Sequence, residues 1–543
     1  MRGNLSAAER DERAETIPRL AWHPIYPFGR PFSLAPNAKL LCLSILIGAV
    51  SGGVAIALYG GVGVGTHLLL GSLGYHPATV AGDLGGFHAT TGPAGLRKWL
   101  IPLLTAAGAL VATTIVYLVA PETHGHGTDN AIRAINSNPT GIRVRALPVR
   151  LIATALTIGS GGSGGTEGPT AQMAATTASV IARWTRLDYR QARVMVTAGL
   201  AAGVGAIFRA PLGGAVLGVE LLFRDDADPV MLVPSMVASF AAYLVFGAVY
   251  GFSPLFGHLP GLGVELSVQL IAFPALGLCV GLLARLFCWG FYALADWFDG
   301  WPGPRPLRAA SAGLLVGLIG LYVPGVLGTG YGTIQDVLSP QRVLGLSVIT
   351  LLLMPLAKIV ATSLTVGSGG SGGVFGPGMV IGATAGAALW RLLEPLGLAP
   401  ASPLSMVIIG MAACLGAASH APLAITLIAA EACGSISLLE PAVIAVPLAV
   451  LIVGRRTLYQ SQPATRQALE KELAKQLLRT PRSGESPREV PDPIAAASIT
   501  SVPEIATERE VPVSQESRSG IAAATGTPRT SSVRLGSSTA YTT

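Results

Sequence analysis

Charged residues are scarce in this sequence. Asp, Glu, Lys and Arg make up 12% of the 543 residues, whereas they make up about 25% of a typical soluble domain. The mean hydropathy is +0.57, and long runs with few charges recur from Ala38 to Leu451. This composition excludes an ordinary soluble globular protein. It predicts a polytopic protein embedded in a lipid bilayer.

Cysteines, cofactor motifs and basic surfaces are also few. The five cysteines lie in apolar runs without metal-ligand spacing, so we expect buried small side chains, no metal and no disulfide framework. No Walker lysine is present, and we expect no cofactor. The net charge of +7 comes mostly from loops and tails, which suits the surface next to a bilayer and not nucleic acid.

The two ends of the sequence lack long apolar runs. Residues 1–36 form a polar segment without a cleavable signal peptide, and their arginines favour a cytoplasmic N-terminus. Residues 37–460 form the predicted membrane domain. Residues 461–543 are rich in Ser, Thr and Pro, which predicts a disordered cytoplasmic tail apart from a helix over Ala464–Leu478. We expect a protein of the bacterial inner (plasma) membrane with both termini in the cytoplasm.

Glycine, in contrast, is abundant, with 68 residues. The segment Gly159–Gln172 reads GSGGSGGTEGPTAQ, and the same pattern returns 208 positions later in Gly367–Met379 as GSGGSGGVFGPGM. Glu167 in the first copy stands where the second copy has Phe375. A glycine-rich break before a membrane helix exposes N–H groups and the positive end of the helix dipole. Two such breaks in corresponding halves predict a transport site at the middle of the membrane, with an anion as its natural ligand.

A second pair of motifs indicates an internal repeat. Ala210–Glu220 reads APLGGAVLGVE, and Ala421–Glu431 reads APLAITLIAAE 211 positions later. The membrane domain therefore divides into related halves at about residues 37–250 and 265–460. The glutamate that ends each motif is expected to have a structural hydrogen-bonding role. Several apolar segments are shorter than the roughly 20 residues that a spanning helix needs, which predicts broken or re-entrant helices. The sequence leaves open whether the halves are inverted.

These motifs resemble those of the CLC family of chloride channels and proton-coupled chloride antiporters. Thr166–Pro169 (TEGP) resembles the family's G-(K/R)-E-G-P motif, and Gly373–Pro377 (GVFGP) resembles its G-x-F-x-P motif. Gly125–Asp129 (GHGTD) falls where the family has G-S-G-I-P, and Tyr459 falls where its last helix supplies a tyrosine. The resemblance covers about residues 37–460. It is closest in kind to bacterial members without C-terminal CBS modules.

The resemblance implies an all-α polytopic fold of two inverted repeats, a homodimer, and an anion pathway in each subunit. It implies transport of small inorganic anions, chloride first, by exchange for protons, and no enzyme activity. Glu167 would be the gate: its carboxylate occupies an anion site, and when protonated it swings out, admits the anion and carries a proton. The anion-binding residues that the resemblance implies are Gly125, His126, Gly127, Thr166, Gly168, Val374, Phe375, Gly376 and Tyr459.

The sequence departs from the family pattern at four positions. Leu221 stands where coupled antiporters have an inner proton-transfer glutamate, so a passive chloride channel gated by voltage or pH is the alternative function. His126 replaces the serine that contacts the central anion; imidazole can donate a hydrogen bond or titrate near neutrality. Asp129 replaces a proline, and Thr166 replaces a basic residue. These departures leave open the preference among chloride, nitrate and fluoride.

Two other function classes match short patterns. The segment Gly159–Gly164 contains the G-x-G-x-x-G spacing of dinucleotide-binding loops, but no strand–turn–helix unit surrounds it. Ser163 lies in a G-x-S-G pattern like that of rhomboid-type intramembrane serine proteases, with His420 as an imaginable base. That pattern recurs at Ser371, and a protease would leave Glu167 unexplained.

Overall fold

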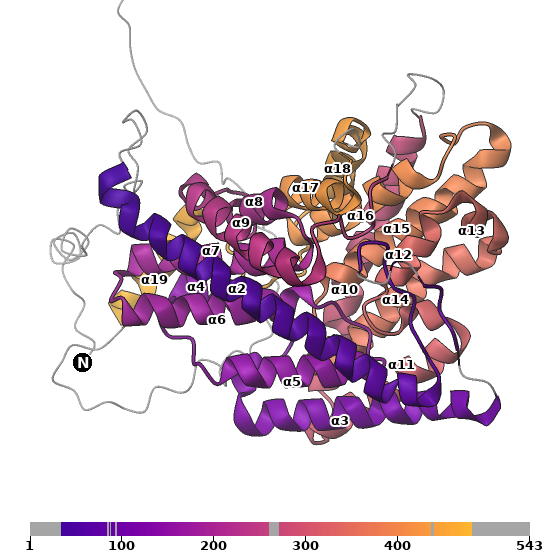
Figure 1. Cartoon of the computed structure of the whole chain (residues 1–543), viewed down its shortest axis with the longest axis horizontal. Coiled ribbons are helices and arrows are strands. Elements are labelled where there is room, and N and C mark those ends of the chain that lie inside the picture. The colour runs from indigo at the N-terminus through magenta and orange to yellow at the C-terminus, as the bar shows by residue number, and fades with distance from the viewer. Residues whose placement is uncertain are drawn as a thin grey trace, which may run out of the picture. The chain divides into compact units, whose positions relative to one another are not determined.

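The computed structural model describes residues 34–83, 86, 88–92, 95–259, 271–435 and 439–479 (Figure 1). Within these ranges the chain is helical, and the β-type pairings there are two isolated bridges. The predicted all-α class is therefore confirmed. The predicted N-terminal polar segment up to residue 33 and the tail beyond residue 479 lie outside the described residues.

The first half contains eight of the described α-helices. They are α2 (Leu34–Leu69), α3 (Ile101–Val119), α4 (Thr128–Ser137), α5 (Ala146–Gly159), α6 (Glu167–Trp184), α7 (Tyr189–Ile207), α8 (Pro211–Glu220) and α9 (Leu232–Tyr250). The first glycine-rich break lies between α5 and α6. The helices of the second half are α10 (Ala272–Asp299), α11 (Arg305–Tyr322), α12 (Tyr331–Val337), α13 (Pro340–Gly345), α14 (Val348–Gly367), α15 (Phe375–Leu393), α16 (Leu404–Ser419), α17 (Pro422–Cys433) and α18 (Leu439–Val453). A final helix, α19 (Arg466–Arg479), falls within the predicted tail and confirms the helix expected there.

Two sets of apolar helices in the described part of the chain differ in length. Five stretches are long and apolar enough to cross a membrane: Ala38–Leu73, Gly95–Val119, Pro229–Tyr250, Ala272–Asp299 and Val348–Gly367. Four other apolar helices have only 10 to 17 residues: Ala146–Gly159, Leu404–Ser419, Pro422–Cys433 and Glu440–Val453. A helix this short leaves its end inside protein at membrane depth, where other parts of the chain must satisfy its backbone. The broken helices that the sequence predicts are therefore present.

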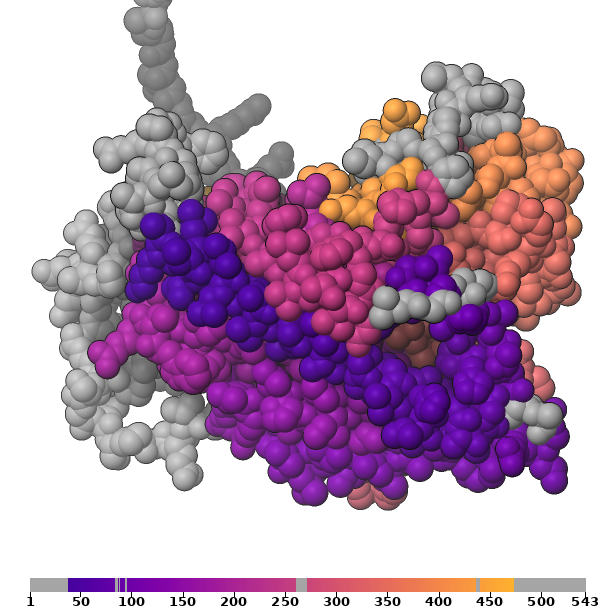
Figure 2. Space-filling view, viewed as in Figure 1, coloured from indigo at the N-terminus to yellow at the C-terminus, as the bar shows by residue number. Residues whose placement is uncertain are grey.

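Helix α2 has an apolar side that no other described element covers. It packs between α5 and α9, and in Figure 2 its indigo surface crosses the face of the molecule. Ile45 and Leu46 are exposed on this side, and Cys42 is exposed with them. The expectation of buried cysteines is wrong for Cys42 and holds in part for the half-buried Cys279, because an apolar thiol also suits lipid. The buried cysteines are Cys288, Cys414 and Cys433.

Glycine allows the helix pairs beside the two breaks to pack closely. At the crossing of α15 with α16, a Cβ on Gly382 would lie 2.0 Å from the carbonyl oxygen of Gly410. In the first half, a Cβ on Gly203 of α7 would lie 2.7 Å from the Cβ of Ala174 on α6. Small residues at these crossings let the helix backbones approach each other, as is common in membrane helices.

The two halves contact each other reciprocally. Gly165 and Gly373 form an antiparallel bridge in which each N–H donates to the other carbonyl at 2.7 Å. The N–H of Ser163 donates to Thr365 Oγ1 at 3.0 Å. The matching N–H, 208 positions later on Ser371, donates to Oγ1 of Thr157 at 3.3 Å. Contacts exchanged in this way are those of two units related by a twofold axis, which is the relation expected of inverted repeats.

Candidate functional site

The two glycine-rich breaks bring the N-termini of α6 and α15 together. Gly161 and Gly369, 208 positions apart, have φ values of +107° and +106°, which glycine adopts without steric cost. Beyond these turns lies the bridge between Gly165 and Gly373. A Cβ on Gly165 would lie 3.0 Å from the N–H nitrogen of Gly376. The side chain of Glu167 therefore fits at the junction only because residue 165 is a glycine.

The carboxylate of Glu167 lies at this junction. Glu167 is the first residue of α6 and is fully buried. Its Oε2 accepts a hydrogen bond from the N–H of Gly376, in the first turn of α15, at 3.1 Å. Its Oε1 accepts one from Thr166 Oγ1 at 3.0 Å and another from the hydroxyl of Tyr331. An acidic side chain thus sits at the N-terminus of a neighbouring helix, where N–H groups and the helix dipole favour an anion.

Three buried side chains near the same junction carry a polar atom without a well-aligned hydrogen bond in the described part of the chain, and the Thr128 and Tyr459 hydroxyls lie within reach of each other. The three atoms are His126 Nδ1, Thr128 Oγ1 and the Tyr459 hydroxyl. The rings of His126 and Tyr459 are 5.4 Å apart, and Tyr459 lies 6.0 Å from the ring of Phe375 at the start of α15. Thr128 Oγ1 is 3.1 Å from where a Cβ on Gly168 would lie. Buried polar groups are normally satisfied, so this cluster is suited to a polar or charged ligand.

Asp129 anchors the segment that carries Tyr459. Its carboxylate accepts hydrogen bonds from the N–H and the hydroxyl of Ser461, both at 2.7 Å. Arg133, one turn along α4, forms an ion pair with it at 3.2 Å. Because Ser461 is only two residues beyond Tyr459, these bonds hold the tyrosine against α4. Asp129 was expected to depart from the family pattern, but its contact with Ser461 could not be predicted from the sequence.

Two buried cations occupy equivalent positions in the halves, 208 residues apart. Arg150 of α5 donates to the carbonyl of Gly125 at 2.8 Å and to Ser371 Oγ at 3.0 Å. Lys358 of α14 donates to the carbonyls of Val326 and Gly328, both at 3.0 Å. Each cation therefore holds the loop that precedes a short helix, α4 or α12. This pair could have been predicted from the sequence, because both basic residues lie next to apolar runs and are separated by the 208 positions of the repeat.

Tyr331 is a second contact that the sequence reasoning missed. It follows the segment Gly328–Gly330, whose glycines have φ values of +64° and +81°. The segment before Thr128 has the same spacing, with Gly125 and Gly127 at +80° and +84°. Both turns start a short helix that brings a hydroxyl to the junction. The two turns share only their glycines in sequence, so the sequence gives little indication that Thr128 and Tyr331 occupy similar positions.

The structure brings the residues of the expected anion site together. Gly168 fits beneath the loop of His126, since a Cβ there would lie 2.3 Å from the His126 carbonyl oxygen. A Cβ on Gly127 would lie 2.7 Å from the carbonyl of Gly168. Val374 and Phe375 are buried at the start of α15. The remaining expected residues, Gly125, Thr166, Gly376 and Tyr459, make the contacts described above.

Three other expectations concern residues around this junction. Leu221 is buried, and its carbonyl accepts a hydrogen bond from Gln462 Nε2 at 2.8 Å. Ser163 Oγ lies 2.9 Å from Thr362 Oγ1, whereas His420 Nε2 lies 2.8 Å from the carbonyl of Arg456. The serine and the histidine thus have separate partners, which contradicts a protease pair. The dinucleotide interpretation is also wrong, because Gly159–Gly164 joins two helices and not a strand to a helix.

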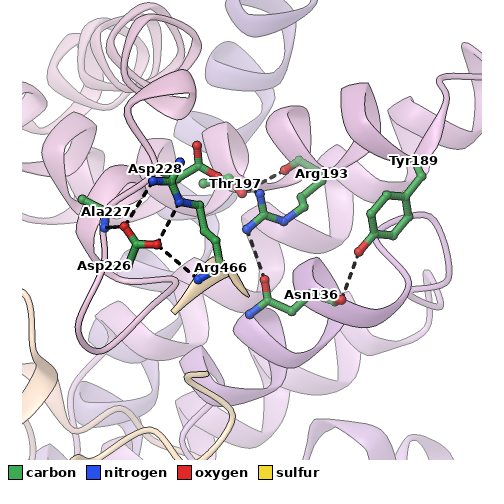
Figure 3. A network of polar contacts seen from close by, with 8 residues as sticks. All are labelled: Asn136, Tyr189, Arg193, Thr197, Asp226, Ala227, Asp228 and Arg466. Atoms are coloured by element: carbon green, nitrogen blue, oxygen red, sulfur yellow. Dashed lines mark hydrogen bonds and ion pairs between the residues drawn. The ribbon is translucent and has the colours of Figure 1, made fainter. Parts of the chain in front are cut away.

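A polar network outside the junction fixes the far end of α4 (Figure 3). Arg193 of α7 forms a buried ion pair with Asp228 at 2.9 Å and donates to Asn136 Oδ1 at 3.3 Å. Arg466 of α19 bonds Asp226 at 2.9 Å, next to this pair. Burial alone would raise the pKa of the Asp226 carboxyl, but the hydrogen bonds from Arg466 lower it below its ordinary value. The network therefore ties α4 and α19 to the loop after α8.

A helical membrane protein with two related halves, and with a buried acid among helix N-termini between them, belongs to the class of ion-transport proteins. The sequence pattern of the voltage-gated chloride channel family matches residues 108–454. The chain therefore belongs to this family, the CLC family, whose members are anion channels and transporters and not enzymes.

Known relatives agree with this assignment. The chain is 33% identical over 377 residues to the voltage-gated ClC-type chloride channel ClcB of Escherichia coli O81, covering 67% of this chain and 86% of the relative. It is 32% identical over 265 residues to an uncharacterized protein of Methanocaldococcus jannaschii, covering 49% of this chain and 65% of that relative. It thus spans just under two thirds of that relative's length.

Solved structures share the fold. A slow cyanobacterial Cl⁻/H⁺ antiporter superposes with a TM-score of 0.64 at 23% identity, covering 81% of this chain and 99% of that one. A CLC-type fluoride/proton antiporter superposes with a TM-score of 0.66 at 22% identity, covering 80% and 100%. At these identities the likeness establishes the polytopic helical architecture.

Proposed function

We propose that this chain carries chloride across a membrane in exchange for protons, with Glu167 as the gate. The observation that carries the proposal is the hydrogen bond from the Gly376 N–H to the Glu167 carboxylate at the start of α15. The same N–H group suits a chloride ion. The carboxylate and the ion are then competitors for one position. Protonation of Glu167 removes its charge and frees the position for the ion.

The buried polar groups on the other side of the junction form the central anion site in this proposal. His126, Thr128 and Tyr459 each present a buried polar atom there. A dehydrated anion would accept hydrogen bonds from these groups. The hydroxyl donors are neutral, so they offset the loss of hydration without the deep trap of a cation in direct contact.

The proton route is the part of the proposed mechanism in which this chain departs from the family pattern that its motifs resemble. Leu221 is buried and apolar, and the neighbouring Glu220 accepts a hydrogen bond from the Ala424 N–H at 2.8 Å. Exchange would then need protons to reach Glu167 without an acid at position 221, for example through water. Passive conduction is the second candidate function, and Leu221 is the observation that favours it.

Reversal potentials of the reconstituted protein test both candidates. In a chloride gradient, a pH gradient shifts the reversal potential of an exchanger and leaves that of a passive channel unchanged. Glu167→Gln should keep anion flux, lose its pH dependence and abolish proton movement driven by chloride. Glu394→Gln, at the exposed far end of α15, is a matched control that should behave as wild type. A Glu167→Gln protein with wild-type pH dependence would remove Glu167 from the gate.

We further propose that the protein is a homodimer in the bacterial plasma membrane with both termini in the cytoplasm. Exposed apolar side chains on α8, α9, α17 and α18 support a subunit interface on these helices. They include Leu212, Phe240, Leu423 and Val443. The arginines of residues 1–36 support the orientation.

A further inference from the structure

Tyr331 is held firmly beside the gate. It is the first residue of α12, it is buried, and its hydroxyl donates to Glu167 Oε1. Its ring packs edge-on against Phe256 at 6.1 Å and lies 6.4 Å from Phe208. A Cβ on Gly376 would lie 3.1 Å from the tyrosine oxygen. The hydroxyl therefore lies beside Gly376 and donates to one oxygen of the carboxylate, Oε1, while the Gly376 N–H donates to the other, Oε2.

A cavity is lined in part by Tyr331. It holds about 360 Å³, and its lining includes Thr166, Tyr59, Tyr75 and Asp83. Thr166 and Tyr331 line this cavity and also donate to Glu167 Oε1. A carboxylate that moves away from these two donors loses both hydrogen bonds.

We propose that Tyr331 is a latch, a residue whose hydroxyl holds the ionised Glu167 side chain on the N-terminus of α15 and so sets the pH at which the pathway opens. This inference rests on the proposed gating role of Glu167. Hydrogen bonds to a carboxylate are stronger than those to a neutral carboxyl group. The latch therefore favours the ionised, closed form, and the pathway opens at a lower pH than it would without the hydroxyl.

Other groups act on the same carboxylate and must stay constant in a test. They are Thr166 from the preceding loop, the Gly376 N–H from α15, and Lys358 of α14, whose charge interacts with that of Glu167. Tyr59 of α2 faces Tyr331 and donates to Asp83 at 2.5 Å. Replacing Tyr331 by phenylalanine removes one hydroxyl and leaves each of these groups in place.

The test compares chloride flux against external pH in liposomes for the wild type and for Tyr331→Phe. We expect the pH of half-maximal flux to rise by about one unit, because one hydrogen bond to a charged acceptor is lost. On the alkaline side of the midpoint, flux should rise about tenfold. Tyr75→Phe is the matched control: Tyr75 lines the same cavity, but its hydroxyl donates to the Pro324 carbonyl at 3.0 Å. It should keep the wild-type midpoint.

Glu167→Gln, alone and combined with Tyr331→Phe, separates the latch from the gate. If the latch acts through the carboxylate, the second change adds nothing to the first. An unchanged midpoint in Tyr331→Phe, with pH dependence lost in Glu167→Gln, would overturn the latch and keep the gate. A flux increase of the same factor at every pH would also overturn it. Wild-type pH dependence in Glu167→Gln would overturn the gate and the latch together.

Discussion

Glu220 and Glu431 each cap the helix that carries the other. Glu431, near the end of α17, accepts hydrogen bonds from the N–H groups of Leu212 and Gly213 in the first turn of α8, at 3.1 and 2.7 Å. Glu220, at the end of α8, accepts one from Ala424 in the first turn of α17 at 2.8 Å. The structural role expected of these two glutamates is thus present. It depends on the antiparallel pairing of two short helices from opposite halves.

Removing one of these caps should cost stability and leave gating unchanged. Glu431→Ala exposes two N–H groups of α8, and we expect a loss of about 1–2 kcal/mol in the free energy of unfolding. Thermal unfolding in detergent, with flux measured against pH, checks this. Glu220→Ala should behave similarly. Loss of proton coupling in Glu220→Ala at wild-type stability would instead make Glu220 a proton carrier.

Anion binding should depend on the Tyr459 hydroxyl. Tyr459→Phe keeps the packing against Phe375 and His126 but removes a donor, so we expect about tenfold weaker chloride or bromide binding by calorimetry. Tyr292→Phe is the control, because its hydroxyl already donates to the Leu458 carbonyl at 2.7 Å. Unchanged affinity and flux in Tyr459→Phe would remove this hydroxyl from the site.

Asp129 should act on the site through Ser461. Asp129→Ala removes the two hydrogen bonds that Ser461 donates to Asp129, so we expect faster hydrogen exchange over residues 457–466 and weaker anion binding. Arg133→Ala removes the ion pair with Asp129 and the hydrogen bond from Arg133 Nε to Ser461 Oγ, but it keeps the two bonds from Ser461 to Asp129, so it should change exchange less than Asp129→Ala does. Equal exchange in the wild type and Asp129→Ala would show that the anchor lies elsewhere.

The docking of α19 should depend on the charge of Asp226. Its pKa lies below the ordinary value of 3.8 in the folded chain. The ionised carboxylate therefore stabilises the docked helix. This stabilisation is complete above about pH 4 and is lost as the pH falls through the lower pKa that Asp226 has in the folded chain. Asp226→Asn should loosen α19 at neutral pH, seen as faster tryptic cleavage after Arg466. Asp225→Asn is the control, because Asp225 pairs with Arg224 and not with α19.

Assembly is a separate prediction. Cross-linking or single-molecule photobleaching in lipid should count two subunits. Leu212→Trp and Leu423→Trp, on exposed positions of α8 and α17, should shift the count toward one by filling the interface. Leu46→Trp, exposed on α2, should not. An active protein that is strictly monomeric would contradict the proposed dimer.

The sequence predicted the parts of the site that depend on glycine and on the repeat offset. Glu167 could be found because an acid in an apolar chain at a glycine-rich break is unusual. The bond from Tyr331 could not be found in this way, since its helix has only seven residues and shares only glycines with the matching turn. The role of Asp129 also needed the structure, because its partner Ser461 lies 332 positions away.

The twofold relation between the halves has a consequence for sidedness. A scaffold in which Gly165 and Gly373 exchange identical bonds presents the same backbone to both faces of the membrane, so it cannot by itself distinguish outside from inside. The distinction must come from positions where the copies differ. Glu167 matches Phe375 in the repeat, so of the two helix N-termini at the junction one begins with a titratable group and the other with an apolar ring. Any difference between transport in the two directions must therefore come from the few side chains that differ between the two halves.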